Sequence, residues 1–92
     1  MIAYIVKADY CAACKPVVDR ILKDGPLLEG LKSRGIEVRI LNISRPDDEA
    51  IADRIGINPS LPQLVATIPN AGTLRVSGGY NEIKDGLESL MG

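Results

Sequence analysis

The chain of 92 residues contains no histidine, no tryptophan and no phenylalanine. Without histidine, Ser–His–Asp triads, Cys–His proteases, His-ligated zinc sites and imidazole acid–base catalysis are all excluded. Only three tyrosines are present, so an aromatic platform for stacking nucleic-acid bases is not expected. The formal net charge is −1, which gives no basic surplus for binding nucleic acid or an anionic membrane. Any chemistry must therefore come from thiols, carboxylates, amines, hydroxyls or the backbone.

Long hydrophobic runs are also missing. No segment approaches the roughly 20 apolar residues that a membrane-spanning helix needs. The apolar run from Ile2 to Val6 ends at Lys7, which makes it too short for the core of a signal peptide. We therefore expect a cytoplasmic protein without a membrane anchor. In that reducing compartment, two cysteines are more often catalytic or metal-binding than structural.

The composition is that of an ordinary globular protein, with 46% hydrophobic and 25% charged residues. A chain of this length buries enough surface for one modest core. We expect a single domain over residues 1–92 and a monomer.

The hydrophobic pattern predicts an α/β protein with the element order β-α-β-α-β-β-α. Strands are expected at residues 2–6, 36–43, 63–68 and 73–76. Helical spacing is expected from Cys14 to residue 22, over 27–35, over 49–55, and in a last helix capped by Asn81. The first two strands are far enough apart for a parallel crossover, and the last two form a hairpin. The expected fold is a four-stranded mixed sheet with helices on both faces.

Cys11 and Cys14 lie three residues apart at the junction of the first strand and the first helix. In a first helical turn, side chains at this spacing face the same way about 5–6 Å apart, which suits a disulfide. The helix N-terminus is expected to lower the pKa of the Cys11 thiol. Lys7 and Lys15 would strengthen this effect, and Asp9 would oppose it.

These positions also predict distinct roles for the two thiols. Cys11, at the loop end, is expected to be the exposed attacking thiolate, and Cys14, one turn into the helix, the buried resolving thiol. Two alternatives remain open. The pair can be half of a zinc or iron–sulfur site shared between two chains, since the sequence offers no other Cys or His ligand. It can also be two inert thiols in an interaction domain.

Four segments resemble motifs of the thioredoxin superfamily, and specifically of a small glutaredoxin-like or minimal thioredoxin protein. In chain order they are Cys11-Ala12-Ala13-Cys14-Lys15, Asn42-Ile43-Ser44, Leu61-Pro62-Gln63-Leu64-Val65 and Gly78-Gly79-Tyr80-Asn81-Glu82-Ile83. The resemblance implies a thioredoxin fold over nearly the whole chain. It also implies a thiol–disulfide oxidoreductase that cycles a Cys11–Cys14 dithiol and disulfide.

The resemblance implies further site residues. Pro62 is expected to be cis and to lie against the thiols, which leaves the Leu61 backbone free to pair with an extended substrate. Gly79 and the backbone N–H groups of Tyr80 and Asn81 are expected either to form a tight turn or to bind a glutathione carboxylate. Tyr10 and Tyr80 are expected to border the substrate groove, whereas Tyr4 belongs to the core.

The expected partners are disulfide-containing proteins and an electron donor. The donor is either glutathione, acting as a co-substrate, or a flavoprotein thioredoxin reductase, and no tightly bound cofactor is expected. Departures from the family pattern keep this choice open, because Tyr10 stands where thioredoxins carry Trp and the central dipeptide is Ala12-Ala13.

Overall fold

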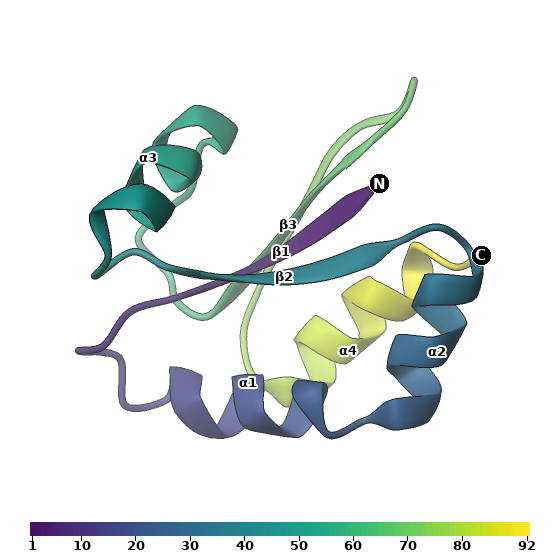
Figure 1. Cartoon of the computed structure of the whole chain (residues 1–92), viewed down its shortest axis with the longest axis horizontal. Coiled ribbons are helices and arrows are strands. Elements are labelled where there is room, and N and C mark those ends of the chain that lie inside the picture. The colour runs from purple at the N-terminus through teal and green to yellow at the C-terminus, as the bar shows by residue number, and fades with distance from the viewer.

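The computed structural model describes residues 1–92, and its elements are arranged around one four-stranded sheet (Figure 1). The strand order is β2-β1-β3-β4, with β1 and β2 parallel and the other two pairings antiparallel. The predicted mixed sheet is therefore confirmed. The elements are β1 (Ile2–Lys7), α1 (Cys14–Leu22), α2 (Gly25–Ser33), β2 (Glu37–Asn42), α3 (Pro46–Ile55), β3 (Gln63–Ile68), β4 (Gly72–Ser77) and α4 (Tyr80–Ser89).

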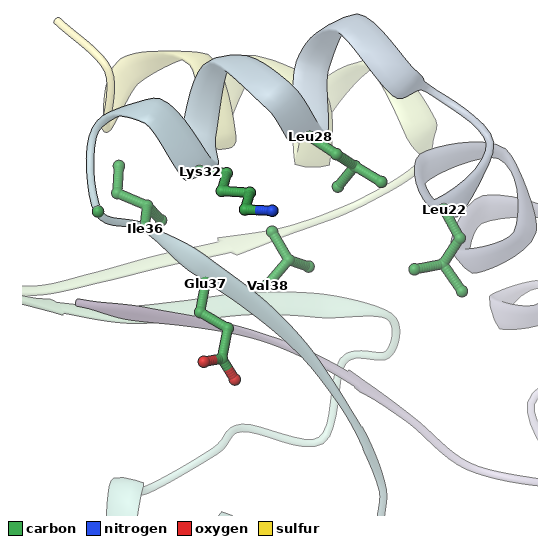
Figure 2. Close-up of a pocket in the computed structure, with 7 residues that line it drawn as sticks. Leu22, Leu28, Lys32, Ile36, Glu37 and Val38 are labelled. Carbon is green, nitrogen blue, oxygen red and sulfur yellow. The ribbon is translucent and has the colours of Figure 1, made fainter.

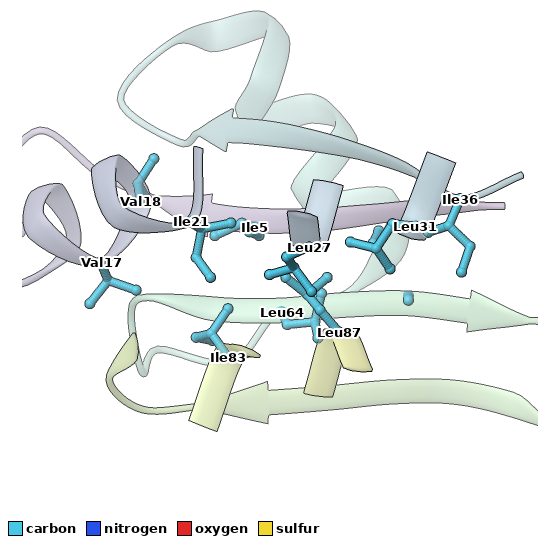
Figure 3. Packing of buried hydrophobic residues seen from close by; sticks show 12 residues of the cluster. Ile5, Val17, Val18, Ile21, Leu27, Leu31, Ile36, Leu64, Ile83 and Leu87 are labelled. Carbon is cyan, nitrogen blue, oxygen red and sulfur yellow. The ribbon is translucent and has the colours of Figure 1, made fainter. Parts of the chain in front are cut away.

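Helices cover both faces of the sheet, as the sequence predicted. Figure 1 shows α1, α2 and α4 on one side and α3 alone on the other. The side chains of β1 alternate between these two layers, so Ile5 joins the larger core and Val6 the smaller one. Figure 3 shows the larger core, in which Ile21, Leu64 and other buried aliphatic side chains meet between the sheet and its three helices.

Strand ends fall within one residue of the predictions, but three helix starts differ. Helix α2 begins at Gly25 rather than at Leu27, because Asp24 caps it and Pro26 fits its first turn. Helix α3 begins at Pro46 rather than at Glu49, because proline fits the first helical turn and acidic residues next to it are stabilised by the helix dipole. The predicted cap by Asn81 is wrong. Gly79 is the N-cap residue of α4, and Asn81 already lies inside the first turn. None of the four helices combines the length and apolarity needed to cross a bilayer.

Candidate active site

The two cysteines lie where the chain leaves β1 and enters α1. Two backbone hydrogen bonds shape this connection: the Cys11 N–H donates to the Ala8 carbonyl at 3.1 Å, and the Cys14 N–H donates to the Cys11 carbonyl at 3.2 Å. The turn brings the two Cα atoms to 5.4 Å, and a disulfide joins Cys11 to Cys14. This separation is within the usual range for a disulfide, so the pair forms without distorting the fold.

The two sulfur-bearing residues differ in exposure. Cys14 is the first residue of α1 and is 1% exposed, whereas Cys11 is partly exposed in the preceding turn. An incoming molecule can therefore reach Cys11 but not Cys14. This asymmetry supports the roles predicted from their positions in the chain.

The segment around Pro62 lies directly against the disulfide, although it is some fifty residues away in sequence. The Leu61–Pro62 peptide bond is cis, as the resemblance implied. The Leu61 carbonyl oxygen is 3.8 Å from Cys11 Sγ. The Gly78 N–H donates to the Pro62 carbonyl at 3.4 Å, so the Gly78-Gly79 turn adjoins the same end of the sheet.

A buried amide anchors the loop that precedes Cys11. Asn42 is 8% exposed, and its Nδ2 donates to Asp9 Oδ1 at 2.8 Å. Its Oδ1 accepts from the Ser44 N–H, and its own backbone N–H donates to Asp48 Oδ2. The Ser44 hydroxyl in turn accepts from the Asp9 N–H at 2.9 Å. These bonds tie the turn after β1 to the turn after β2.

A second buried amide anchors the loop that precedes Leu61. Gln63 is fully buried, and its Nε2 donates to the Asn58 carbonyl at 2.7 Å, to Asn58 Oδ1 at 3.1 Å and to the Ser60 carbonyl at 2.8 Å. Its Oε1 accepts from the Asn58 N–H at 3.3 Å. In the sequence, Gln63 stands out only as part of a motif, and no local pattern indicates these contacts.

Lys15 and Lys7, the two residues predicted to act electrostatically on Cys11, differ in exposure. Lys15 is well exposed, and its Nζ forms an ion pair with Asp19 Oδ2 at 3.0 Å, one turn along α1. Lys7 is partly buried at the last position of β1. Because exposed charges are screened by water, we expect Lys15 to act only weakly on Cys11.

The two tyrosines predicted at the groove lie in different places. Tyr10 is 78% exposed and adjoins Cys11 in the chain, so an incoming molecule can contact its ring. Tyr80 instead packs under the Arg20 guanidinium, 3.8 Å from its ring centroid, and its hydroxyl donates to Asp24 Oδ2 at 3.1 Å. Arg20 lies six residues beyond Cys14, about 9 Å along the helix axis, so these contacts hold Tyr80 toward the far end of α1.

At that far end, the Asp24 carboxylate contacts both α2 and α4. Its carboxylate accepts from the Leu27 N–H and caps α2, and this bond is the main reason that the pKa of Asp24 is lowered. The Tyr80 hydroxyl and the Lys84 ammonium, 3.6 Å away, lower the pKa of this carboxyl further. The contacts of Asp24 with Tyr80 and Lys84 hold the start of α4 against the junction of α1 and α2.

The start of α4 presents the N–H groups of Tyr80 and Asn81, which the resemblance assigned to an anion. Gly78 has a φ of 146°, and a Cβ built there would meet the Glu82 side chain at 3.0 Å, so only glycine fits. The Glu82 side chain folds over both glycines and brings its own carboxylate to the helix N-terminus. An anionic ligand would therefore share this end of the helix with Glu82.

The surface around the disulfide is not a pocket. Each of the three hollows of the molecule is lined without Cys11, Cys14 or Pro62. Figure 2 shows one of them, an apolar groove between α2 and the edge strand β2, where Leu28 and Val38 face each other. Sites for small molecules are usually concave, so the open surface at Cys11 suits a large partner better.

The described chain offers no metal site of its own. It contains no group of three or more His, Cys, Asp or Glu side chains placed to hold an ion. The alternative of a zinc or iron–sulfur site therefore requires ligands from a second chain.

Comparison with known proteins identifies the fold. No protein-family model matches the chain, and neither does any curated protein sequence. Among solved structures, a thioredoxin from Thermus thermophilus matches with a TM-score of 0.66 and 20% identity, over 97% of this chain and 72% of that one. Thioredoxin 1 from Thermosipho africanus TCF52B matches with a TM-score of 0.60 and 14% identity, over 99% and 94% of the two chains.

The C-terminal domain of DsbD from Neisseria meningitidis, solved in its reduced form, gives a TM-score of 0.58 at 14% identity, over 96% of this chain and 78% of that one. Together these likenesses show that the chain has the thioredoxin fold. Within that fold, Cys11 and Cys14 form the Cys-x-x-Cys pair.

Proposed function

We propose that this chain is a thiol–disulfide oxidoreductase that cycles between a Cys11–Cys14 disulfide and a dithiol. The observation that supports this most strongly is the asymmetry of the disulfide: a partly exposed Cys11 is bonded to a fully buried Cys14 at the N-terminus of α1. An inert structural disulfide has no need for one accessible sulfur. The thioredoxin fold supports the same class of reaction.

In the reducing direction, the Cys11 thiolate attacks one sulfur of a substrate disulfide. A mixed disulfide forms, and the other substrate sulfur leaves as a thiolate that takes up a proton. Cys14 then loses its proton and attacks Cys11 Sγ, which releases the second substrate sulfur and closes the Cys11–Cys14 disulfide. Two electrons and two protons pass to the substrate, so an external reductant must restore the dithiol.

Disulfide-containing proteins are the proposed substrates, because Cys11 lies on an open surface beside the exposed Tyr10 ring and the Leu61 carbonyl. Glutathione mixed disulfides are a second substrate class. We propose a monomer in the cytoplasm, recharged by glutathione or by a flavoprotein thioredoxin reductase and without a tightly bound cofactor. Assays coupled to each reductant separately distinguish these two donors.

Substitution Cys14→Ser tests the assignment of roles. Without the resolving thiol, Cys11 should accumulate a mixed disulfide with a disulfide-bonded protein substrate, visible on a non-reducing gel and lost after reduction. Cys11→Ser is the matched control and should trap almost none, because Cys14 is buried. Equal trapping by both variants would refute the assigned roles, and no trapping or turnover by any form would refute the function.

A further inference from the structure

Buried polarity in this small protein is concentrated at one end of the sheet. Of its 22 buried residues, only Asn42 and Gln63 are polar. Asn42 ends β2 and Gln63 begins β3, so both lie at the end of the sheet that bears the disulfide. Burying an amide costs free energy unless it is fully hydrogen-bonded. The hydrogen-bond partners of each buried amide therefore indicate which segment it holds in place.

All the hydrogen bonds of the Gln63 side chain go to one loop, residues 58–60. Four hydrogen bonds join it to the backbone and side chain of Asn58 and to the Ser60 carbonyl. Asn58, Pro59 and Ser60 are themselves exposed, whereas the Ile57 and Leu61 side chains on either side of them pack against the smaller core. Between these two apolar anchors, the buried amide determines the path of the loop, and Leu61 follows Ser60 directly.

We infer that Gln63 is a positioning residue, which holds the Leu61 carbonyl oxygen against Cys11 Sγ and thereby sets the reactivity of the attacking thiol. This inference rests on the proposed function. The contact it explains is the 3.8 Å approach of the Leu61 oxygen to Cys11 Sγ, made between loops that follow β1 and precede β3.

Elementary chemistry predicts whether the Leu61 carbonyl favours the thiol or the thiolate of Cys11. In the dithiol form, the Cys11 S–H can donate to the Leu61 oxygen, whereas a thiolate in the same place meets the negative end of the carbonyl dipole. The contact therefore favours the protonated thiol. Releasing the loop removes the carbonyl and admits water, and both changes favour the thiolate.

The test uses Gln63→Met, which keeps the side-chain volume but removes the amide. In a Cys14→Ser background Cys11 is the only thiol, so its alkylation by iodoacetamide across a pH series reports its ionisation. We expect the pH midpoint of the alkylation profile to fall by about 0.4–1 unit, corresponding to the loss of one typical hydrogen bond. The fold should survive, because the exposed loop can exchange its bonds for water.

Two further variants distinguish positioning from general destabilisation. Leu64→Ala, at the next residue of β3, should lower the melting temperature without moving the midpoint, since Leu64 packs into the opposite core. Asn58→Ala keeps Gln63 but removes one of its partners, and should move the midpoint in the same direction by less. It replaces Gln63→Met should that variant not fold.

An unchanged midpoint in the folded variants would overturn the positioning role, even if their stability falls. A midpoint that moves equally in Leu64→Ala would do the same. Failure of the proposed function has a different signature, since Cys14→Ser with Gln63 intact would then trap no mixed disulfide through Cys11. The two ideas can therefore be rejected separately.

Discussion

Gly86 gives the sharpest test of the packing between α4 and the sheet. From sequence alone, a glycine inside a helix costs about 1 kcal/mol relative to alanine, so Gly86→Ala should stabilise the protein. The structure reverses that expectation. A Cβ at this position would lie 2.8 Å from Leu64 Cδ2 and 3.1 Å from Val76 Cγ2. Leu64 is fully buried, so it has little room to move.

The two effects can be weighed against each other. Overpacking a filled core typically costs about 1–3 kcal/mol, and a contact as short as 2.8 Å belongs toward the upper end of that range. Subtracting the gain in helix propensity leaves a net loss of about 1–2 kcal/mol in the free energy of unfolding. For a domain of this size, the melting temperature should fall by about 5–10 °C.

Gly30→Ala is the matched control, because Gly30 also lies inside a helix, α2. Its Cβ would meet Met91 Sδ at 3.1 Å, but Met91 is a flexible, partly exposed side chain near the C-terminus. It can move aside, so this variant should be neutral or gain up to about 1 kcal/mol. Urea denaturation of both variants, with the disulfide intact, measures the difference. Equal stabilisation of the two would refute the close packing described for Gly86.

Three other predictions concern polar groups. Asp24→Asn keeps a helix cap without the charge, so the variant should be less stable than the parent at pH 7. Because the pKa of Asp24 is lowered in the folded protein, this difference in stability should shrink as the pH falls from about 4 through the lowered pKa. Thermal melts at several pH values measure the change. Asn42→Ala removes the two hydrogen bonds of its buried side chain, to Asp9 and from the Ser44 N–H, and should cost about 1–3 kcal/mol in urea denaturation, together with faster amide hydrogen exchange between residues 8 and 11. Lys15→Met should change the pH profile of Cys11 alkylation little, since the Lys15 charge is exposed and paired along the helix; a large shift would show that it acts on the thiol directly.

The fold was predictable because its signals are local. β-branched and alternating apolar residues marked the strands, and their ends differ from the observed ones by at most one residue. Helix starts were less predictable, because several residues near each start compete for the cap. Asn81 is a good capping residue by type, yet the extended backbone at Gly79 begins α4 two residues earlier than that cap requires.

The candidate site was predictable in part. Cys11 and Cys14 are close in sequence, so a helical turn was enough to bring them together. The contacts of Gln63 were not predictable, because all four of its hydrogen bonds go to backbone groups or to a side-chain amide whose positions depend on how the loop folds. The contacts of Tyr80 with Arg20 and Asp24 depend likewise on how α4 packs against α1, which no local pattern specifies.

The register of the sheet explains why distant segments meet at one site. Val6, near the end of β1, pairs with Gln63 at the start of β3, and Gln63 pairs with Ser77 at the end of β4. The chain leaving β1, the chain entering β3 and the chain leaving β4 must therefore emerge side by side, which places Cys11, Leu61 and Gly78 together. A slip of two residues between β1 and β3 would preserve which face each side chain occupies but would displace Leu61 by about 7 Å relative to Cys11. The hydrogen bonds of Gln63 stay within its own loop, so this residue sets the position of Leu61 relative to β3, whereas the pairing of β3 with β1 determines where Leu61 meets Cys11.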